Sequence, residues 1–374
     1  MTPSPSPSLP GPSPLTVAIL LSDGLESKGG IGRVMTYLSR ELGERHPDIR
    51  VVACRSRPAS RGLARHLGVP VALARFARQC RARQVDVVHI NIARRGSTWR
   101  KMLFAGMTRM MGMKLVLHLH GSGYDGYYAQ LPRFARKRVS RLFNSADAVI
   151  ALSPYWRDVL VDHIHVAPEK VHVIGNGVPS PATPEAAAEP PPAVPTILFM
   201  GELGERKGID LLLPALAALS AQGLAWRAVI AGNGAVQEAR DRATSLGLAA
   251  DILFPGWVGE EEVSHHMRKA DIFTLPSRAE NQPLSILEAM AHGLPVVSTT
   301  VGAIPEQVRD GESGFLVPPG DAEALARALA RLVRDADLRA AMGEAGRRHF
   351  ARHYSLAACA DRFAALYRSL LPGA

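Results

Sequence analysis

Short apolar runs alternate with longer amphipathic segments along most of this chain. In the first half, a buried strand is predicted at 15–21, and apolar residues then recur at helical spacing from 31 to 44. The alternation continues with strands expected at 51–53, 85–90, 114–120, 148–151 and 171–174, and helices expected at 61–83, 99–111 and 133–144. Strands that alternate with helices in this way are typical of an α/β protein with a parallel, doubly wound sheet.

The pattern stops at 179–195, a segment rich in proline, alanine and glutamate, and then begins again. We interpret this segment as a linker. Strands are then expected at 196–200, 227–231, 252–254, 271–275, 295–299 and 314–317, with helices between them and helical segments at 321–335 and 337–371. The sequence therefore predicts two Rossmann-like domains, 15–178 and 196–354, facing a central cleft. A Pro/Ser-rich tail at 1–14 is expected to be disordered, and a C-terminal helix is expected within 355–374.

Length and composition agree with two such domains. The chain has 374 residues and a hydrophobic content of 47%. Its three cysteines, Cys54, Cys80 and Cys359, are far apart, which argues against a disulfide framework or a zinc site. The tail lacks the charged and apolar regions of a signal peptide, and no apolar run approaches the roughly 20 residues of a membrane span. A cytoplasmic protein is expected.

Charge divides the chain into a basic and an acidic half. Residues 1–180 contain 26 Lys and Arg against 11 Asp and Glu, whereas residues 181–374 contain 18 against 23. An anionic partner is therefore expected at the first half only. Nucleic acid is not expected, because the basic clusters contain few aromatic residues and no nucleic-acid-binding motif is present. An alternative is a general excess of solvated arginine.

Two glutamates eight residues apart, Glu280 and Glu288, flank Pro283. This proline suits the first turn of a helix, because its missing N–H would have no partner there. Glu280 is therefore expected on the loop after a strand, and Glu288 on the following helix, whose N-terminus favours a phosphate. Two carboxylates around an anion site suggest sugar-nucleotide chemistry. The alternative is a solvated loop glutamate and an ordinary helical one.

Glycine-rich turns follow the first predicted strand of each domain. In the first domain the turn contains Gly29 and Gly30, and glycines there let the backbone approach a ligand closely. In the second domain Arg206 and Lys207 stand just before a helix, where they could clamp a diphosphate. A tight turn and two exposed basic residues remain the alternatives.

A histidine ends a predicted strand of the first domain. His120 could donate to a sugar hydroxyl or to a leaving phosphate. His118 is expected to face the other way. Trp257 and Val258 could flank a base; for Trp257 we interpret the residue as a packing one instead.

No metal and no cofactor are expected. Asp335 and Asp337 resemble an aspartate pair that holds a metal in nucleotide-sugar transferases of another fold, but here they join two predicted helices. The histidine pairs His163/His165 and His265/His266 lack other ligands nearby.

Together these motifs resemble the retaining GT-B glycosyltransferases of family 4. The resemblance covers nearly the whole chain after the tail. It is carried by Glu280 and Glu288 with the following Ala289–Val297 stretch, by the Arg206-Lys207-Gly208 turn, by Gly29-Gly30-Ile31 and by His120-Gly121.

The resemblance implies transfer of a sugar from a nucleotide donor, UDP- or GDP-linked, with retained anomeric configuration. It assigns the donor diphosphate to Lys207 and to amides near Leu284 and Ser285, and the ribose to Glu288. Glu280 and His120 would contact the transferred sugar, Gly30 would approach the reacting centre, and Val258 would lie near the base. The final helix would cross back to the first domain. One departure is Glu202, which stands where the family usually has arginine, so Arg206 is a candidate substitute.

The acceptor is expected on the basic domain. A cationic helix carries Arg133, Arg136, Lys137, Arg138 and Arg141. An apolar stripe of Trp99, Met102, Leu103, Met107 and Met110 lies near Arg95, Arg100 and Lys101. Such a surface suits docking on the anionic inner face of the plasma membrane, to reach a polyprenyl-diphosphate-linked or other glycan acceptor. A core stripe with a solvated face is the alternative.

Three functions are consistent with these motifs. The first is a glycosyltransferase that builds a polysaccharide or lipid-linked oligosaccharide. The second is a GT-B-fold isomerase acting on a sugar nucleotide, such as a 2-epimerase, which needs no basic acceptor surface. The third is a non-catalytic sugar-nucleotide binder, which the Glu202 departure keeps open. The donor sugar, the base, the acceptor and the oligomeric state do not follow from the sequence.

Overall fold

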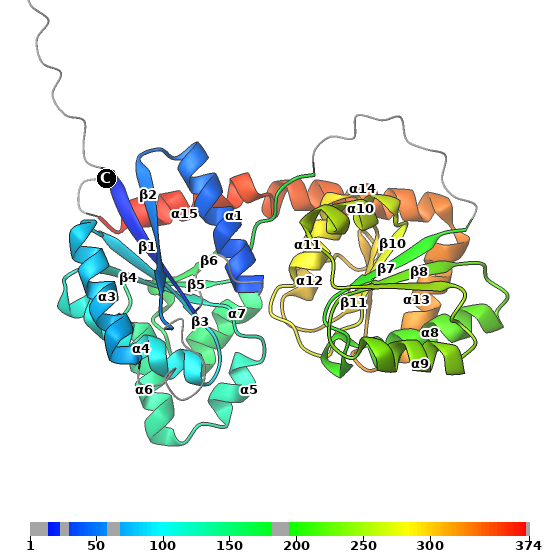
Figure 1. The fold of residues 1–374 in the computed structure, drawn as a ribbon, viewed down its shortest axis with the longest axis horizontal. Coiled ribbons are helices and arrows are strands. Elements are labelled where there is room, and N and C mark those ends of the chain that lie inside the picture. Colours follow the sequence, from blue (N-terminus) through cyan, green and yellow to red (C-terminus); the bar gives the residue numbers. More distant parts are fainter. Residues whose placement is uncertain (1–13, 23–29, 58–67, 182–193, 372–374) are drawn as a thin grey trace, which may run out of the picture.

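The computed structural model describes residues 14–22, 30–57, 68–181 and 194–371. Within these residues, the strands form two six-stranded parallel sheets, each covered by helices (Figure 1). The predicted α/β class with two doubly wound domains is therefore confirmed. The tail to residue 13, most of the linker and part of the helix expected at 61–83 lie outside the described residues.

The first sheet has the strand order β2-β1-β3-β4-β5-β6. Its strands are β1 Leu15–Leu21, β2 Ile49–Arg55, β3 Val87–Ile92, β4 Lys114–Leu119, β5 Ala148–Ala151 and β6 Val171–Val173. The helices are α1 Gly30–Arg45, α3 Val69–Ala82, α4 Gly96–Met110, α5 Tyr124–Ala129, α6 Arg133–Asn144 and α7 Pro154–Asp158, the last followed by a π-helical turn at Val159–His163. Strands β3, β4 and β5 are buried almost throughout, as their continuous apolar sequences require.

The second sheet has the order β12-β11-β10-β7-β8-β9. Its strands are β7 Thr196–Met200, β8 Arg227–Ala231, β9 Ile252–Gly256, β10 Ile272–Leu275, β11 Val296–Thr299 and β12 Gly314–Val317. The helices are α8 Ile209–Ala221, α9 Val236–Ser245, α10 Glu260–Lys269, α11 Leu284–Ala291, α12 Ile304–Gln307 and α13 Ala322–Arg334. In each sheet the strand order reverses next to the first strand of the domain, β1 or β7. Ligands of such sheets bind at this reversal point.

The C-terminal segment consists of two helices, α14 Ala336–His353 and α15 Leu356–Ser369. The two helices separate at Tyr354, because the Ser355 hydroxyl accepts from the Ala358 amide and caps a new helix, and α15 lies within the 355–374 segment expected to hold the C-terminal helix. Figure 1 shows α14 on the second domain and α15 lying across the first. Ion pairs from Arg45 to Asp361 and from Arg368 to Asp48 hold α15 against the first domain.

Candidate functional site

A cavity of about 560 Å³ lies between the two domains, where the strand ends of both sheets meet. The nine residues predicted for catalysis and donor binding all line it: Gly30, His120, Arg206, Lys207, Val258, Glu280, Leu284, Ser285 and Glu288. Residues 120 and 30 come from the first domain and the other seven from the second. The fold therefore brings together residues that lie up to 258 positions apart in the sequence.

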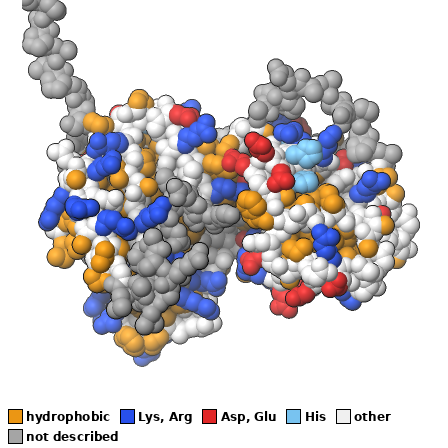
Figure 2. All heavy atoms as spheres, in the orientation of Figure 1, with side chains coloured by type: hydrophobic (Ala, Val, Ile, Leu, Met, Phe, Trp, Pro, Cys, Tyr) orange, Lys and Arg blue, Asp and Glu red, His pale blue; other side chains and the backbone are white. Residues whose placement is uncertain are grey.

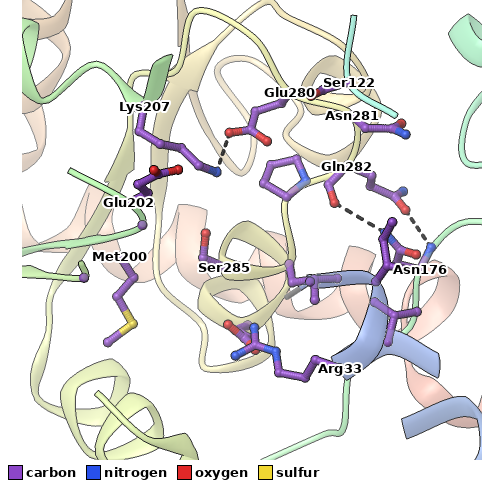
Figure 3. A pocket seen from close by; sticks show the side chains of 18 of the residues that line it. Arg33, Ser122, Asn176, Met200, Glu202, Lys207, Glu280, Asn281, Gln282 and Ser285 are labelled. Carbon is purple, nitrogen blue, oxygen red and sulfur yellow. Dashed lines mark hydrogen bonds and ion pairs between the residues drawn. The ribbon is translucent and has the colours of Figure 1, made fainter. Parts of the chain in front are cut away.

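Glu280 is held at the floor of the cavity by cations. It lies on the loop between β10 and α11, and Lys207 Nζ is 2.5 Å from its Oε1 (Figure 3). The Ser277 hydroxyl donates to the same oxygen at 2.9 Å, and Arg206 Nη1 lies 3.6 Å away. The side chain of Glu280 is only 8% exposed. One carboxylate oxygen is thus fixed by three groups.

A glycine lets a second loop approach the backbone of Glu280. A Cβ at Gly302 would lie 2.3 Å from the Glu280 carbonyl oxygen, and Gly302 has a φ of +57°. Any larger residue would clash with that carbonyl group and strain its own backbone. The glycine therefore helps to fix the position of Glu280.

Glu202 and Arg206 form an ion pair at the edge of the cavity. Arg206 Nη2 lies 3.2 Å from Glu202 Oε2, and both side chains are more than 40% exposed. Arg206 Nη1 lies 3.6 Å from Glu280 Oε1, the same oxygen that Lys207 contacts, so the two cations lie side by side. Arg206 therefore presents a second cation at the cavity edge, paired with Glu202.

Glu288 forms an ion pair across the cleft that the sequence analysis missed. Arg33, in the first turn of α1, places Nη2 2.7 Å from Glu288 Oε1. Burial raises the pKa of the Glu288 carboxyl, and Arg33 opposes that rise. No local pattern links two residues 255 positions apart, but the position of Arg33 directly after the Gly30 turn was a signal that could have been used.

The start of α11 is exposed to the cavity as expected, with a shift of one residue. Pro283 is the N-cap and Leu284 the first helical residue. The N-cap residue offers no side-chain acceptor to the first amides. These N–H groups and the helix dipole form a site for negative charge.

The loop before α11 is also held by the first domain. The Gln282 Oε1 atom accepts from the Asn176 amide at 2.6 Å, and the Asn176 side chain donates to the Gln282 carbonyl at 3.4 Å (Figure 3). The Asn281 side chain donates to the Leu119 carbonyl, also at 3.4 Å. These buried amides, which the sequence analysis did not single out, attach the Glu280 loop to both domains.

His120 lies on the first-domain side of the cavity, directly after β4. Burial lowers the pKa of His120 well below its ordinary value, and His89 and Lys101 lower it further. The ring is therefore a neutral imidazole near pH 7.

The expectation that His118 faces away from His120 is wrong. The two ring centroids are 3.8 Å apart. Residues two positions apart along a strand share one face, so the alternation of side chains places them together. Burial, followed by His120 and His89, lowers the pKa of His118 well below its ordinary value.

Trp257 lines the cavity beside Val258, and 59% of its surface is exposed. The interpretation of Trp257 as a packing residue is therefore wrong. It follows β9, which ends at Gly256 with a φ of +81°. An exposed indole at the cavity edge offers a flat apolar surface to a base.

The cationic helix predicted at 133–144 is α6, and it lies away from the cavity. Arg133, Lys137, Arg138 and Arg141 are exposed and Arg136 is half-buried. Of the apolar stripe on α4, Leu103 and Met110 are exposed, whereas the other members pack on the first-domain core. Figure 2 shows basic and apolar side chains together on the lower part of the first domain, where α4 and α6 lie.

Lys101 does not belong to this surface. It is 2% exposed, and its Nζ donates to the Asn91 carbonyl. It lies on the inner face of α4, so the expectation that it flanks an exposed stripe is wrong.

Within the described ranges, no cluster of three or more His, Cys, Asp or Glu side chains is placed to hold a metal ion. Asp335 is the N-cap of α14, and its carboxylate accepts from the Leu338 amide, so its role is to cap that helix. In the same described part of the chain, no helix has the length and hydropathy to cross a membrane.

Two family models match the chain. Residues 185–349 match "Glycosyl transferases group 1", and residues 28–180 match "Glycosyltransferase Family 4". Among curated relatives, the chain is 30% identical over 265 residues to the GDP-mannose-dependent alpha-(1-6)-phosphatidylinositol monomannoside mannosyltransferase of Mycolicibacterium smegmatis, which covers 66% of this chain and 68% of the relative. It is 28% identical over 284 residues to the alpha-D-kanosaminyltransferase of Streptomyces kanamyceticus, covering 71% and 72%. Three further relatives are matched over only 49% to 55% of their length.

One solved structure shares the fold of nearly the whole chain. The HepE protein of Anabaena, solved in complex with UDP, superimposes with a TM-score of 0.75 at 20% identity, covering 95% of this chain and all of that one. The same protein has been solved with UDP-glucose. The two-domain fold, the paired family models and the mannosyltransferase relative agree, and the chain belongs to the GT-B glycosyltransferases of family 4.

Proposed function

We propose that this protein is a retaining glycosyltransferase that moves a sugar from a nucleotide donor to a polysaccharide precursor or lipid-linked acceptor. The observation that carries the proposal is the interdomain cavity in which the cations Arg206 and Lys207, the N-terminus of α11 and the carboxylates of Glu280 and Glu288 face the same space. Such a cavity suits a ligand with a diphosphate at its centre and hydroxyl groups at both ends.

Each end of the donor has a chemically suited partner. Lys207, Arg206 and the N-terminus of α11, with its amides at Leu284 and Ser285, stabilise the diphosphate. Glu288 accepts from the ribose hydroxyls, and Trp257 and Val258 contact the base. At the other end, Glu280 and His120 contact the transferred sugar, and Gly30 leaves room for the reacting centre. The names of relatives and neighbours include GDP-mannose and UDP-glucose, so both UDP- and GDP-linked donors are candidates.

The chemistry that fits is attack on the same face of the sugar that the leaving group occupies. The nucleoside diphosphate leaves with negative charge, which Lys207, Arg206 and the dipole of α11 stabilise. A leaving phosphate oxygen takes the proton of the acceptor hydroxyl, and the new glycosidic bond forms on the same face. We disfavour a covalent Glu280 intermediate, because Oε1 of that carboxylate is already fixed by Lys207 and Ser277. Lys207, Arg206 and the dipole of α11 offset the charge of the leaving group without a metal.

The acceptor approaches from the first domain, and we propose that the protein docks on an anionic membrane surface. Arg133, Lys137 and Arg138 of α6 are exposed around Phe134, which is itself 65% exposed. Met110 of α4 is 84% exposed on the same domain. Exposed apolar side chains surrounded by cations are typical of surfaces that bind anionic lipid headgroups. Anionic liposomes should therefore sediment the protein, and reversing the charge of Arg136, Lys137 and Arg138 to glutamate should abolish this. Unchanged sedimentation would contradict membrane docking.

A panel of UDP- and GDP-sugars separates the candidate functions. Slow release of nucleoside diphosphate and free sugar from one donor supports the transferase. Conversion of a sugar nucleotide to its epimer would instead support an isomerase, and binding without turnover would support a non-catalytic binder. The Arg206–Lys207 pair beside Glu280 favours the transferase, because it is placed to stabilise a departing diphosphate.

A further inference from the structure

A second cavity, of about 470 Å³, lies between the two domains and adjoins the donor cavity at Glu280. Among the described residues, Glu280 is the one that lines both cavities. The first domain contributes Asp125 of α5 with Tyr155 and Trp156 of α7, and the second domain contributes Glu306 of α12. The proposed function places the transferred sugar at Glu280. The second cavity is therefore next to the position from which an acceptor must attack.

Two buried polar atoms at this cavity lack a hydrogen-bond partner within the described residues. They are Trp156 Nε1 and Glu306 Oε2. Trp156 is 1% exposed, yet it lines the cavity. The other Glu306 oxygen, Oε1, accepts from the Tyr155 amide at 3.3 Å, which holds this carboxyl at the junction of the domains. Burial raises the pKa of Glu306. A buried donor and a buried acceptor are both unfavourable when unpaired, and the hydroxyls of a bound ligand would satisfy the two of them.

Tyr155 and Asp125 add a surface that suits a sugar ring. The Tyr155 hydroxyl donates to Asp125 Oδ2 at 3.2 Å, so the two side chains from different helices hold each other in place. The ring of Tyr155 is exposed and stands at 82° to that of Trp156. An exposed aromatic ring offers an apolar face to the C–H groups of a pyranose, while carboxylate oxygens accept from its hydroxyls.

The charge of the second cavity disfavours an anionic ligand. Asp125 and Glu306 have no cationic partner among the described residues, and Glu280 is already paired with Lys207. The cation that lines this cavity is Arg278, whose Nη1 and Nη2 atoms donate to the Asp210 carboxylate at 2.7 and 2.6 Å. The basic residues of α6 do not line it. A phosphate or carboxylate bound here would meet like charges without a cation to offset them.

We propose that the second cavity is the acceptor subsite and that it takes the uncharged, hydroxyl-rich end of a glycan in preference to a phosphorylated or acidic sugar. This inference rests on the proposed function for the position of the donor, and it adds the chemical class of the acceptor. A hydroxyl of the bound glycan bonds to the anomeric carbon of the donor as the bond from that carbon to the diphosphate breaks. Its proton passes to the leaving phosphate oxygen. The diphosphate of a lipid-linked acceptor would lie outside this cavity, where α6 presents its cations.

Saturation-transfer NMR of the full chain tests binding without turnover. The probes are the methyl α-glycosides of glucose, mannose and galactose, each compared with its 6-phosphate, with UDP or GDP present. We expect at least one methyl glycoside to receive saturation at its ring protons, its 6-phosphate to receive none, and Tyr155→Ala to abolish the signal. Arg157→Ala is the matched control, because Arg157 is exposed on the same helix and does not line the cavity. It should bind the glycoside as wild type does.

Three results of this NMR experiment would overturn the proposal. They are saturation of the 6-phosphates as strong as that of the methyl glycosides, no saturation of any probe, and an unchanged signal in Tyr155→Ala.

Turnover with the sugar nucleotide identified from the panel tests the consequence. We expect the methyl glycoside that binds to be recovered with an added sugar, and its 6-phosphate to have a kcat/KM at least about tenfold lower, because it brings like charges together. Asp125→Ala should raise KM for the glycoside about tenfold, the order expected when a hydrogen bond to a charged group is lost, whereas Arg157→Ala should keep the wild-type KM. Equal use of the 6-phosphate, or an unchanged KM in Asp125→Ala, would overturn the proposal. If wild type turns over no donor, the proposed function fails, while the NMR result still decides whether the cavity binds a neutral sugar.

Discussion

The cross-cleft ion pair between Arg33 and Glu288 gives a prediction that can be worked out from the structure. Glu288 is a nearly buried carboxyl, with its side chain 13% exposed, and burial raises its pKa. Arg33 opposes this rise from 2.7 Å. In Arg33→Gln the pKa of Glu288 should therefore rise further, and a larger share of the carboxyl should be protonated as the pH falls towards 6. A protonated Glu288 loses acceptor capacity towards the ribose hydroxyls.

The size of the effect follows from the exposure of the pair. Breaking a fully buried ion pair costs about 3–5 kcal/mol. The Arg33 side chain is 35% exposed, so water still solvates its guanidinium and the cost is smaller. We expect about 1–2 kcal/mol, which corresponds to a loss of about five- to thirtyfold in affinity. The loss should be larger near pH 6 than near pH 8, because only the carboxylate form accepts from both hydroxyls.

Calorimetric Kd values for UDP and GDP at the two pH values measure this effect directly. Arg40→Gln is the matched control, since Arg40 lies on the same helix, is 81% exposed and pairs only with its neighbour Glu44 among the described residues. The reasoning is refuted if Arg33→Gln binds both nucleotides as tightly as Arg40→Gln, or if the weakening is the same at both pH values.

Three further outcomes are expected. Lys207→Ala should lower kcat by about 10²–10³, because it removes a cation placed to stabilise the leaving diphosphate, and steady-state turnover at saturating donor would detect it. Trp257→Ala should weaken UDP and GDP binding by about 1 kcal/mol while leaving ribose 5-phosphate binding unchanged, and equal weakening of all three would contradict contact with the base. The free energy of unfolding, measured in urea, should fall below about pH 6.5 by up to about 1.4 kcal/mol per pH unit for each of His89, His118 and His120, because burial lowers their pKa values and the unfolded chain binds protons first. A pH-independent unfolding free energy would contradict this, and exposed His163→Gln should leave the slope unchanged.

The parts of the fold that the sequence predicted best are those with strong local signals. The strands at 148–151, 196–200, 227–231 and 314–317 and the helix at 133–144 agree with the structure residue for residue. Each is a short apolar run between turn signals or a segment with clear helical spacing. Helices α5 and α7 were missed because six and five residues are too few to show a period.

For the site, the sequence predicted which residues gather but not how they pair. Motif positions at strand ends and helix starts, together with the family resemblance, were enough to bring nine residues to one cavity. The pairing of Glu288 with Arg33, and of His89 with Tyr367, could not be predicted from the sequence, because it depends on how the two domains and α15 pack. The error at His118 was different, since the two-residue period of a strand already places it with His120.

The central claim is that the Glu280–Lys207 cavity transfers a sugar from a nucleotide donor with retention. The most direct test is time-resolved proton NMR of the donor that the panel identifies, with wild type and with Glu280→Ala. The account predicts that wild type releases nucleoside diphosphate together with a sugar that first appears in the anomeric configuration of the donor, and that Glu280→Ala loses most of this turnover. Full turnover by Glu280→Ala, or a sugar that first appears as the opposite anomer, would contradict it.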